Sequence, residues 1–352
     1  MRRCLFLALF LAITAAAQSV TVRILATTDL HGNIYPYDYF TAKPAPRGIA
    51  KIATLIAQER NPNTLLIDCG DTIQGATLET VHQQAVRKGT KDPDPMMLAM
   101  NKLGYDMMTL GNHEFNYGLK NLEAARQAAK FPWVSANIEG PAKFAPYFIK
   151  TVSGVRVAIV GITTETIPSW EKKENYAPLK FESAVAVAKK TVAELRASKK
   201  ADVIVISAHT GLDRDTRTGV VHEQSLANEQ VAYQIAESAG ADAVIFGHTH
   251  AELASYKVGD VLMMQPRNWG MSLGEMDITV ERDGASWKIS SKKSKTIPVT
   301  DATAVDESIL AIGKPYHEAA EKYLSQLVAE SPVALSTAMS RVEDTALIDA
   351  IQ

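Results

Sequence analysis

Short apolar runs alternate with segments of helical spacing, and this rhythm constrains the fold of the chain more than any other feature. Seven runs have the length and composition of buried strands: 21–27, 64–67, 107–110, 155–162, 202–207, 243–246 and 261–265. Helical spacing of apolar residues is found between them, at 47–58, 95–103, 181–199 and 223–239. The alternation predicts a layered α/β fold with helices flanking central β-sheets. Segments 273–280 and 286–299 alternate as antiparallel strands do, so we expect mixed sheets.

These patterns divide the chain into four parts. Residues 18–300 are predicted to form the α/β domain, and 301–332 a linker that contains a long helix over 307–330. The segment 333–352 is too short to bury a core of its own. We interpret this last segment as the start of a second domain that the sequence does not complete.

The first seventeen residues have the pattern of a secretory signal peptide. Arg2 and Arg3 precede an apolar stretch, and Ala15–Ala17 fits a small-residue cleavage site. The alternative is an N-terminal membrane anchor, but the stretch is short of the about 20 residues that a span requires. Cleavage predicts a periplasmic or secreted protein without stable membrane insertion. Cys69 would then be the only cysteine, and we expect it to be a buried, unreactive thiol.

The charge of the chain argues against polymeric nucleic acid as a partner. Among 352 residues the formal net charge is −2, and basic and acidic residues are nearly balanced. An anionic small-molecule substrate would therefore have to be attracted by cations held locally. The sequence leaves the oligomeric state open.

Polar motifs follow five of the apolar runs. They are Asp29-Leu30-His31, Gly70-Asp71, Gly111-Asn112-His113-Glu114, Ala208-His209-Thr210-Gly211 and Gly247-His248-Thr249-His250. Open α/β sheets bind ligands at the carboxyl ends of their strands, so these motifs are expected to meet at one edge. A single histidine at a strand end is more often structural, but five of the eight histidines fall within these motifs.

The motifs carry the chemistry of a metal site. Carboxylate, amide and imidazole ligands without thiolate suit Mn, Zn, Fe, Co or Mg. The ligands are too many for one ion and sufficient for two divalent ions. We predict that Asp71 bridges them, because a carboxylate can join two metals at the spacing used for displacement at phosphorus. The flanking Gly70 would let the backbone approach the ions.

The order of these motifs resembles that of the calcineurin-like metallophosphoesterases. Longer stretches are similar to the periplasmic 2',3'-cyclic-nucleotide 2'-phosphodiesterase/3'-nucleotidases, which are relatives of bacterial 5'-nucleotidases: ATTDLHGNIYPYDYF, IDCGDTIQG, TLGNHEFNYGL and PRNWGMSLGEMDI. The resemblance implies metal-dependent hydrolysis of 2',3'-cyclic nucleotides and 3'-nucleotides in nucleotide salvage, by a water that two metals activate.

The resemblance also implies a role for each motif residue. One ion would be held by Asp29, His31, Asp71 and His250, and the other by Asp71, Asn112, His209 and His248. His113 would act on the substrate phosphate, by stabilising charge or by protonating the leaving oxygen. The 5'-nucleotidase branch has an Asp three residues after this histidine, where this chain has Asn116, which we interpret as a marker of the cyclic-phosphodiesterase branch.

Other functions stay open at this point. A 5'-nucleotidase, a UDP-sugar hydrolase or a general phosphodiesterase would use the same metal site. A nucleotide-binding module without turnover is a further alternative, although such a protein is expected to lack His113 or a ligand. Arg267 and Asn268 follow a strand close to the site, and we expect one of them to contact phosphate.

Overall fold

The computed structural model describes residues 18–340, 342, 343 and 345–351. The predicted signal peptide at 1–17 lies outside these residues. Within the described part of the chain, no helix is both long and apolar enough to cross a membrane.

Two six-stranded sheets form the centre of the molecule. The first has the strand order β16(Ser286–Pro298), β15(Ser272–Asp283), β1(Ser19–Thr27), β4(Thr64–Asp68), β5(Met107–Thr109) and β6(Trp133–Val134). The second has the order β13(Leu253–Val258), β14(Val261–Gln265), β12(Ala243–Phe246), β11(Val203–His209), β9(Val155–Thr163) and β8(Tyr147–Val152). In each sheet four neighbouring strands are parallel and the remaining pairs are antiparallel, which confirms the expected mixed sheets.

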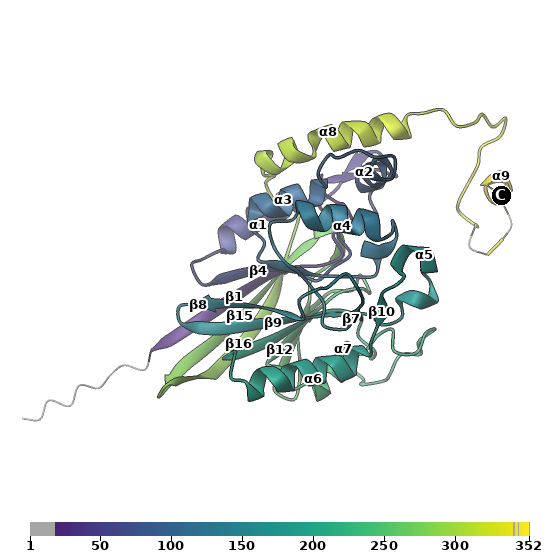
Figure 1. Cartoon of the computed structure of the whole chain (residues 1–352). Coiled ribbons are helices and arrows are strands. Elements are labelled where there is room, and N and C mark those ends of the chain that lie inside the picture. The colour runs from purple at the N-terminus through teal and green to yellow at the C-terminus, as the bar shows by residue number, and fades with distance from the viewer. Residues whose placement is uncertain (1–17, 341, 344, 352) are drawn as a thin grey trace, which may run out of the picture.

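Helices cover the outer face of each sheet, so the fold has four layers (Figure 1). The first sheet is covered by α1(Ile49–Glu59), α2(Thr77–Arg87), α3(Pro95–Leu103), α4(Leu119–Ala128) and α8(Glu307–Leu324). The second is covered by α6(Ala184–Ala197) and α7(Ala232–Ser238). One apolar cluster lies between the sheets and one lies beneath each helical layer. Burial on both faces explains why the central strands are continuous apolar runs.

The helix ends follow local sequence signals. Asp94 accepts a hydrogen bond from the backbone of Met97, Pro95 occupies the first turn of α3, and Gly104 ends the helix in the left-handed conformation. Asp306 caps α8 in the same way by accepting from Ser308 and Ile309. These helices begin where their capping residues predict.

The helix predicted over 181–199 is trimmed at both ends to α6, and two other predicted helices are shortened much more. The segment 223–239 contains only α7, because Gln224 uses its side chain to bind the backbone N–H and C=O of Gln230 and holds a loop before the helix. The linker helix ends at Leu324 instead of residue 330. The exposed Leu327 and Val328 beyond it have no apolar layer to pack on.

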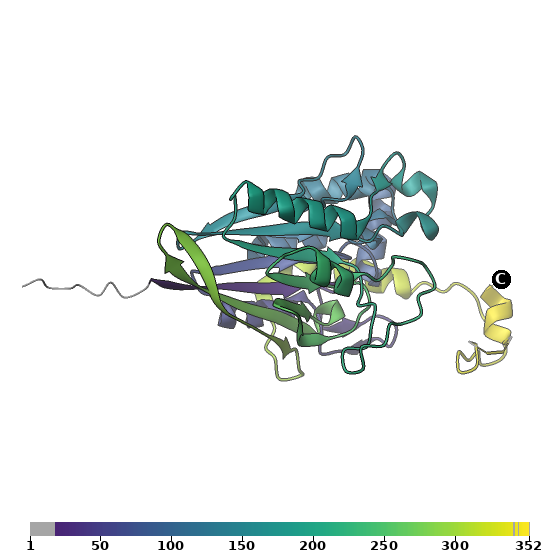
Figure 2. The same cartoon turned by 90° about the horizontal axis from the view of Figure 1, so that it is seen from below.

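The remaining elements are small or peripheral. They are β2(Tyr37–Asp38), β3(Lys43–Pro44), β7(Ile138–Glu139), β10(Lys180–Phe181), α5(Lys173–Tyr176), α9(Ala346–Ile351) and the 3-10 helices η1(His113–Phe115), η2(Ile167–Ser169) and η3(Asn268–Gly270). After α8 the chain leaves the layered body, and α9 lies apart from it in both views (Figure 2).

Candidate metal centre and active site

The carboxyl ends of the parallel strands carry the five polar motifs to one edge of the two sheets. All seven predicted ligands meet there in two groups. Asp29, His31 and His250 form the first group, and Asp71, His209 and His248 form the second; within each, the candidate ligand atoms lie within 4.8 Å of one another. Asn112 joins the second group, because its Oδ1 lies 2.9 Å from His248 Nδ1.

Two carboxylates lie where the groups meet. Asp71 Oδ2 is 2.9 Å from Nε2 of His209 and 3.9 Å from Nε2 of His31, so it faces both groups. Asp29 Oδ1 lies 3.5 Å from His250 Nε2 and 4.0 Å from Nε2 of His209. A carboxylate oxygen in this position can face one cation of each group, which is the arrangement expected of a bridging ligand.

Backbone carbonyls fix the tautomers of two histidines. His31 Nδ1 lies 2.7 Å from the carbonyl oxygen of Gln74, and His209 Nδ1 lies 2.7 Å from that of Cys69. Since a carbonyl only accepts, each Nδ1 carries a proton, and in the neutral ring each Nε2 turns its lone pair toward the other candidate ligands. Nε2 of His209 is buried and has no partner with hydrogen-bond geometry among the described residues. A buried lone pair that faces carboxylates fits a metal cation.

The charges of the site favour a cation at the same place. Burial alone would lower the pKa of His209, but the carboxylates of Asp71, Asp29 and Glu114 outweigh it and raise this pKa to about 10. Burial lowers the pKa of His31, where the same two aspartates only partly oppose it. The carboxylates that stabilise a proton on His209 would equally stabilise a metal ion there.

Backbone strain is concentrated in the ligands. Five of the seven predicted ligands have a positive φ, a region that costs non-glycine residues about 1–3 kcal/mol each: Asp29 (50°), His31 (46°), Asp71 (61°), His248 (79°) and His250 (56°). Close packing maintains this geometry, because a Cβ at Gly111 would collide with Asp71 Oδ1 and one at Gly247 with Thr28 Oγ1. Strain held in place at converging polar side chains is typical of a functional site.

Comparisons with known proteins agree with this geometry. The family model for calcineurin-like phosphoesterases matches residues 22–252. The chain belongs to the calcineurin-like phosphoesterase family. This phosphoesterase is 32% identical to the 2',3'-cyclic-nucleotide 2'-phosphodiesterase/3'-nucleotidase of Salmonella typhimurium, over 98% of this chain and 57% of that protein.

Two comparisons involve Bacillus subtilis. The trifunctional nucleotide phosphoesterase protein YfkN is 33% identical over 94% of this chain and 24% of that protein. The crystal structure of calcineurin-like phosphoesterase YfkN superposes with a TM-score of 0.77 at 32% identity, covering 88% of this chain and all of that one. The chain spans about half the length, or less, of curated relatives such as these.

Glu114 is the main organising residue that the sequence did not reveal. It is fully buried in the phosphoesterase, and its carboxylate accepts backbone N–H groups of Asp71, Thr72, Ile73 and Gly111. It therefore ties the loop after β4 to the loop after β5. Glu114 stands within the recognised motif, but only the fold shows that its side chain turns away from the ligands.

Glu229 is a second residue found only in the structure. Its Oε1 lies 3.3 Å from Nε2 of His248, and its carbonyl oxygen accepts a hydrogen bond from Thr210 Oγ1. It lies in the loop that replaces the first half of the predicted helix 223–239. A carboxylate on the outer nitrogen of a histidine orients the ring and makes the inner nitrogen a better ligand.

His113 lies beside the first group without belonging to it. Its ring is 5.2 Å from the His31 ring, centroid to centroid, and its backbone N–H donates to Asp71 Oδ1. Its Nδ1 lies 2.5 Å from Oδ1 of Asn116. The structure thus brings His113 next to the candidate ligands, with Asn116 bonded to its ring.

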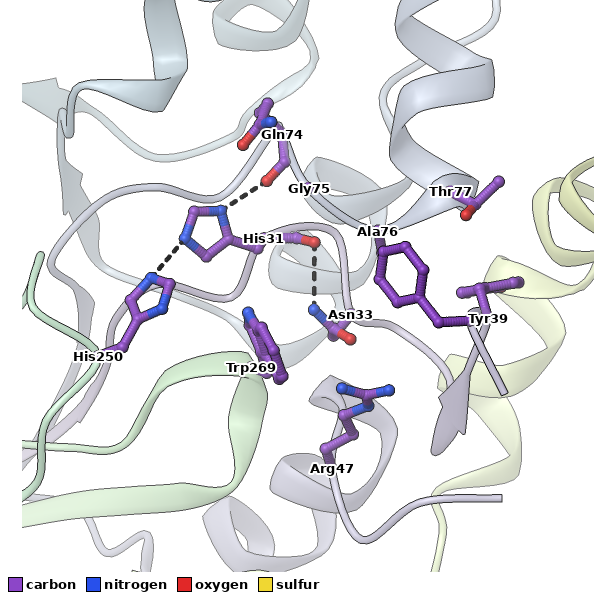
Figure 3. Close-up of a pocket in the computed structure, with 11 residues that line it drawn as sticks. His31, Asn33, Tyr39, Arg47, Gln74, Gly75, Ala76, Thr77, His250 and Trp269 are labelled. Atoms are coloured by element: carbon purple, nitrogen blue, oxygen red, sulfur yellow. Dashed lines mark hydrogen bonds between the residues drawn. The ribbon is translucent and has the colours of Figure 1, made fainter. Parts of the chain in front are cut away.

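A cavity of about 260 Å³ opens next to the first group (Figure 3). His31 and His250 lie at one end, and Trp269, Arg47 and Tyr39 are among the other lining residues. The guanidinium of Arg47 lies over the Trp269 ring, 5.0 Å from its centroid.

Arg267 and Asn268, the predicted phosphate contacts, do not line this cavity. Arg267 is exposed and Asn268 is buried, and their neighbour Trp269 reaches the cavity instead. Trp269 has a φ of 59° and donates its backbone N–H to the carbonyl oxygen of Asp29. The predicted contacts stay predictions, and the structure adds Trp269 as a candidate.

Proposed function

We propose that this phosphoesterase hydrolyses nucleotide phosphoesters, namely 2',3'-cyclic nucleotides and 3'-nucleotides, with two divalent metal ions. The observation that carries the proposal is Asp71, whose carboxylate faces the candidate ligands of both groups. The substrate class is supported by the names of the relatives, three of which are 2',3'-cyclic-nucleotide 2'-phosphodiesterase/3'-nucleotidases.

The proposed ligand sets follow the two groups. Asp29, His31, Asp71 and His250 would hold one ion, and Asp71, Asn112, His209 and His248 the other. Two ions bound there would polarise the phosphoryl oxygens and lower the pKa of a water. Manganese, zinc, iron, cobalt and magnesium all suit these oxygen and nitrogen donors.

His113 supplies the proton chemistry in this proposal. With Nδ1 facing Asn116, its Nε2 is the nitrogen available to the substrate. When the ring carries a proton on each nitrogen, Nε2 can donate to an equatorial phosphoryl oxygen or to the oxygen of the leaving group. The backbone bond to Asp71 fixes the start of this side chain relative to the ligands.

The cavity at Trp269 would receive the organic part of the substrate. It begins at His31 and His250, so a phosphate held by the ions would have its ester group directed along it. Its volume of about 260 Å³ is below the about 300–1,000 Å³ of a pocket that encloses a whole ligand. It would therefore hold a nucleoside only in part, with the Trp269 ring as the stacking surface.

Export and domain organisation belong to the same proposal. The signal peptide predicted at 1–17 would direct the protein to the periplasm or outside the cell. Residues 18–300 would form the catalytic domain. The helix α8 would link it to a segment that begins at about residue 333.

Steady-state kinetics on three substrates tests the proposal. We expect the purified chain with Mn²⁺ to hydrolyse a 2',3'-cyclic nucleotide and a 3'-nucleotide with higher kcat/KM than the matching 5'-nucleotide. The second candidate is a 5'-nucleotidase, since relatives with that name are also found among the matches at about 25% identity. A clear preference for the 5'-nucleotide would favour it and refute the first choice.

A further inference from the structure

A line of three hydrogen-bonded side chains runs from His113 away from the metal groups. His113 Nδ1 lies 2.5 Å from Asn116 Oδ1, and Asn116 Nδ2 donates to Glu171 Oε2. Glu171 comes from the segment after β9, 55 residues further along the chain. We propose that Glu171 is a positioning residue, which fixes the amide of Asn116 and through it the ring and tautomer of His113.

The direction of each bond follows from the carboxylate at the outer end. A carboxylate offers acceptors only, so Asn116 must turn its NH₂ group to Glu171. The carbonyl oxygen of Asn116 then faces His113, and Nδ1 of His113 must carry a proton to donate to it. Without Glu171 the amide could turn over and present NH₂ to the ring, which would stabilise the other tautomer.

Glu171 is itself held in place. Its Oε1 accepts a hydrogen bond of 2.7 Å from Asn175 Nδ2 and one of 2.7 Å from the backbone of Lys172. Asn175 Nδ2 also lies 3.1 Å from the carbonyl oxygen of Asn116, which accepts from Arg87 as well. Both ends of the Asn116–Glu171 contact are therefore anchored, as a positioning role requires.

The segment that carries Glu171 also contacts the second group of candidate ligands. Trp170 stacks on His248, with ring centroids 6.1 Å apart and planes inclined by 22°. Trp170 thus contacts the predicted ligand His248, and its neighbour Glu171 contacts Asn116, the partner of His113. A segment that only covered the surface would not require a bond between the Glu171 carboxylate and Asn116.

This arrangement answers a question raised by the sequence, and it rests on the proposed role of His113. A neutral amide stands where the resemblance to 5'-nucleotidases leads one to expect an aspartate. In the structure the carboxylate of Glu171 lies on the far side of the Asn116 amide from His113. The negative charge is therefore displaced by one amide and is not lost. Asn116 and Glu171 together would orient His113 as a single aspartate does.

A double-mutant cycle between Glu171 and Asn116 tests the inference by kinetics on a 2',3'-cyclic nucleotide with Mn²⁺. We expect E171A to lower kcat by roughly tenfold with little change in KM, as loss of an orienting partner does. In the N116D background an aspartate would orient His113 directly, and Glu171 would repel it. There E171A should leave kcat unchanged or raise it. Equal losses in both backgrounds would overturn the proposal.

A matched control lies three residues further along, in the short helix α5. Glu174 is exposed, and E174A should behave as the wild type. Should E171A fold poorly, E171Q keeps the size of the side chain. Its single oxygen cannot serve Asn116 and the donors Asn175 and Lys172 together, so a smaller loss of kcat is expected. A folded E171Q with wild-type kcat would contradict the proposed role.

A spectroscopic readout separates this inference from the proposed function. Nitrogen NMR of ¹⁵N-histidine in the zinc-loaded chain at pH 8 reports the tautomer of His113, assigned by comparison with H113N. We expect a proton on Nδ1 in the wild type and a mixture of tautomers in E171A. An unchanged tautomer in E171A would overturn the positioning role, even if the wild type hydrolysed none of the nucleotides tested.

Discussion

Replacing Glu114 with glutamine should separate the two loops that carry Asp71 and Asn112. Oε1 of Glu114 accepts from the backbone of Thr72 at 2.6 Å and of Ile73 at 3.4 Å. Oε2 accepts from Asp71 at 2.9 Å and from Gly111 at 2.6 Å. Glutamine keeps only one oxygen, and its NH₂ group would face two backbone donors.

The size of the effect follows from those two unpaired donors. A buried N–H without a partner costs about 1–3 kcal/mol, so E114Q should lower the free energy of unfolding by about 2–6 kcal/mol. The loops would also shift, and a displacement of about 1 Å at a catalytic site can reduce the rate by roughly 100-fold. Urea unfolding would measure the first effect, and kcat on a 2',3'-cyclic nucleotide the second.

A partly exposed glutamate provides the control. Glu123 on α4 pairs with Arg126 at the surface, and E123Q should change stability by no more than about 1 kcal/mol and leave kcat unchanged. If E114Q were as stable and as active as E123Q, the carboxylate would not hold the loops together, and the reasoning would be wrong.

Two further predictions concern residues at the rim of the site and far from it. W269A should raise KM for nucleotides by roughly tenfold through lost stacking, whereas W269F should raise it little. Hydrolysis of a small aryl phosphodiester by W269A should change little. An equal effect of W269A on both substrates would show that Trp269 acts through the backbone of Asp29. At the opposite end of the strands, burial of Asp202 is outweighed by its bonds to Arg156, which hold the pKa of its carboxyl below the ordinary value. Because the folded pKa is lowered, this pair stabilises the fold above about pH 4 and is lost as the pH falls through the folded pKa. D202N should therefore cost at most about 1 kcal/mol at pH 7, the cost should vanish in acid, and activity at pH 7 should not change.

The apolar strands were predictable because their pattern is local. The runs at 243–246 and 261–265 match β12 and β14 residue for residue, and buried parallel strands leave this continuous signal. The edge strands β8 and β13 are half-exposed, carry no such run, and were not predicted. The helix predicted over 223–239 was wrong in its first half, since the bonds from the Gln224 side chain to the backbone of Gln230 do not show in the periodicity of apolar residues.

The sequence predicted the candidate ligands of the site, but not the residues that hold those ligands in place. Asp29, Asp71 and His209 could be named because polar residues after buried strands meet at one sheet edge. Glu229 and Glu171 stand at positions that look like ordinary surface glutamates in the sequence, and Glu114 stands in a recognised motif without a predicted role. Their partners are set by tertiary contacts that a single sequence does not encode in any local pattern.

The most direct test of the two-metal proposal compares metal content with hydrolysis in the wild type and D71N. The wild type should bind two Mn²⁺ per chain, lose hydrolysis of a 2',3'-cyclic nucleotide on chelation and recover it when Mn²⁺ is restored. D71N, which removes the carboxylate facing both groups, should bind fewer than two ions and hydrolyse none of the substrate. Full activity of the metal-stripped wild type at neutral pH, or of D71N, would contradict the account.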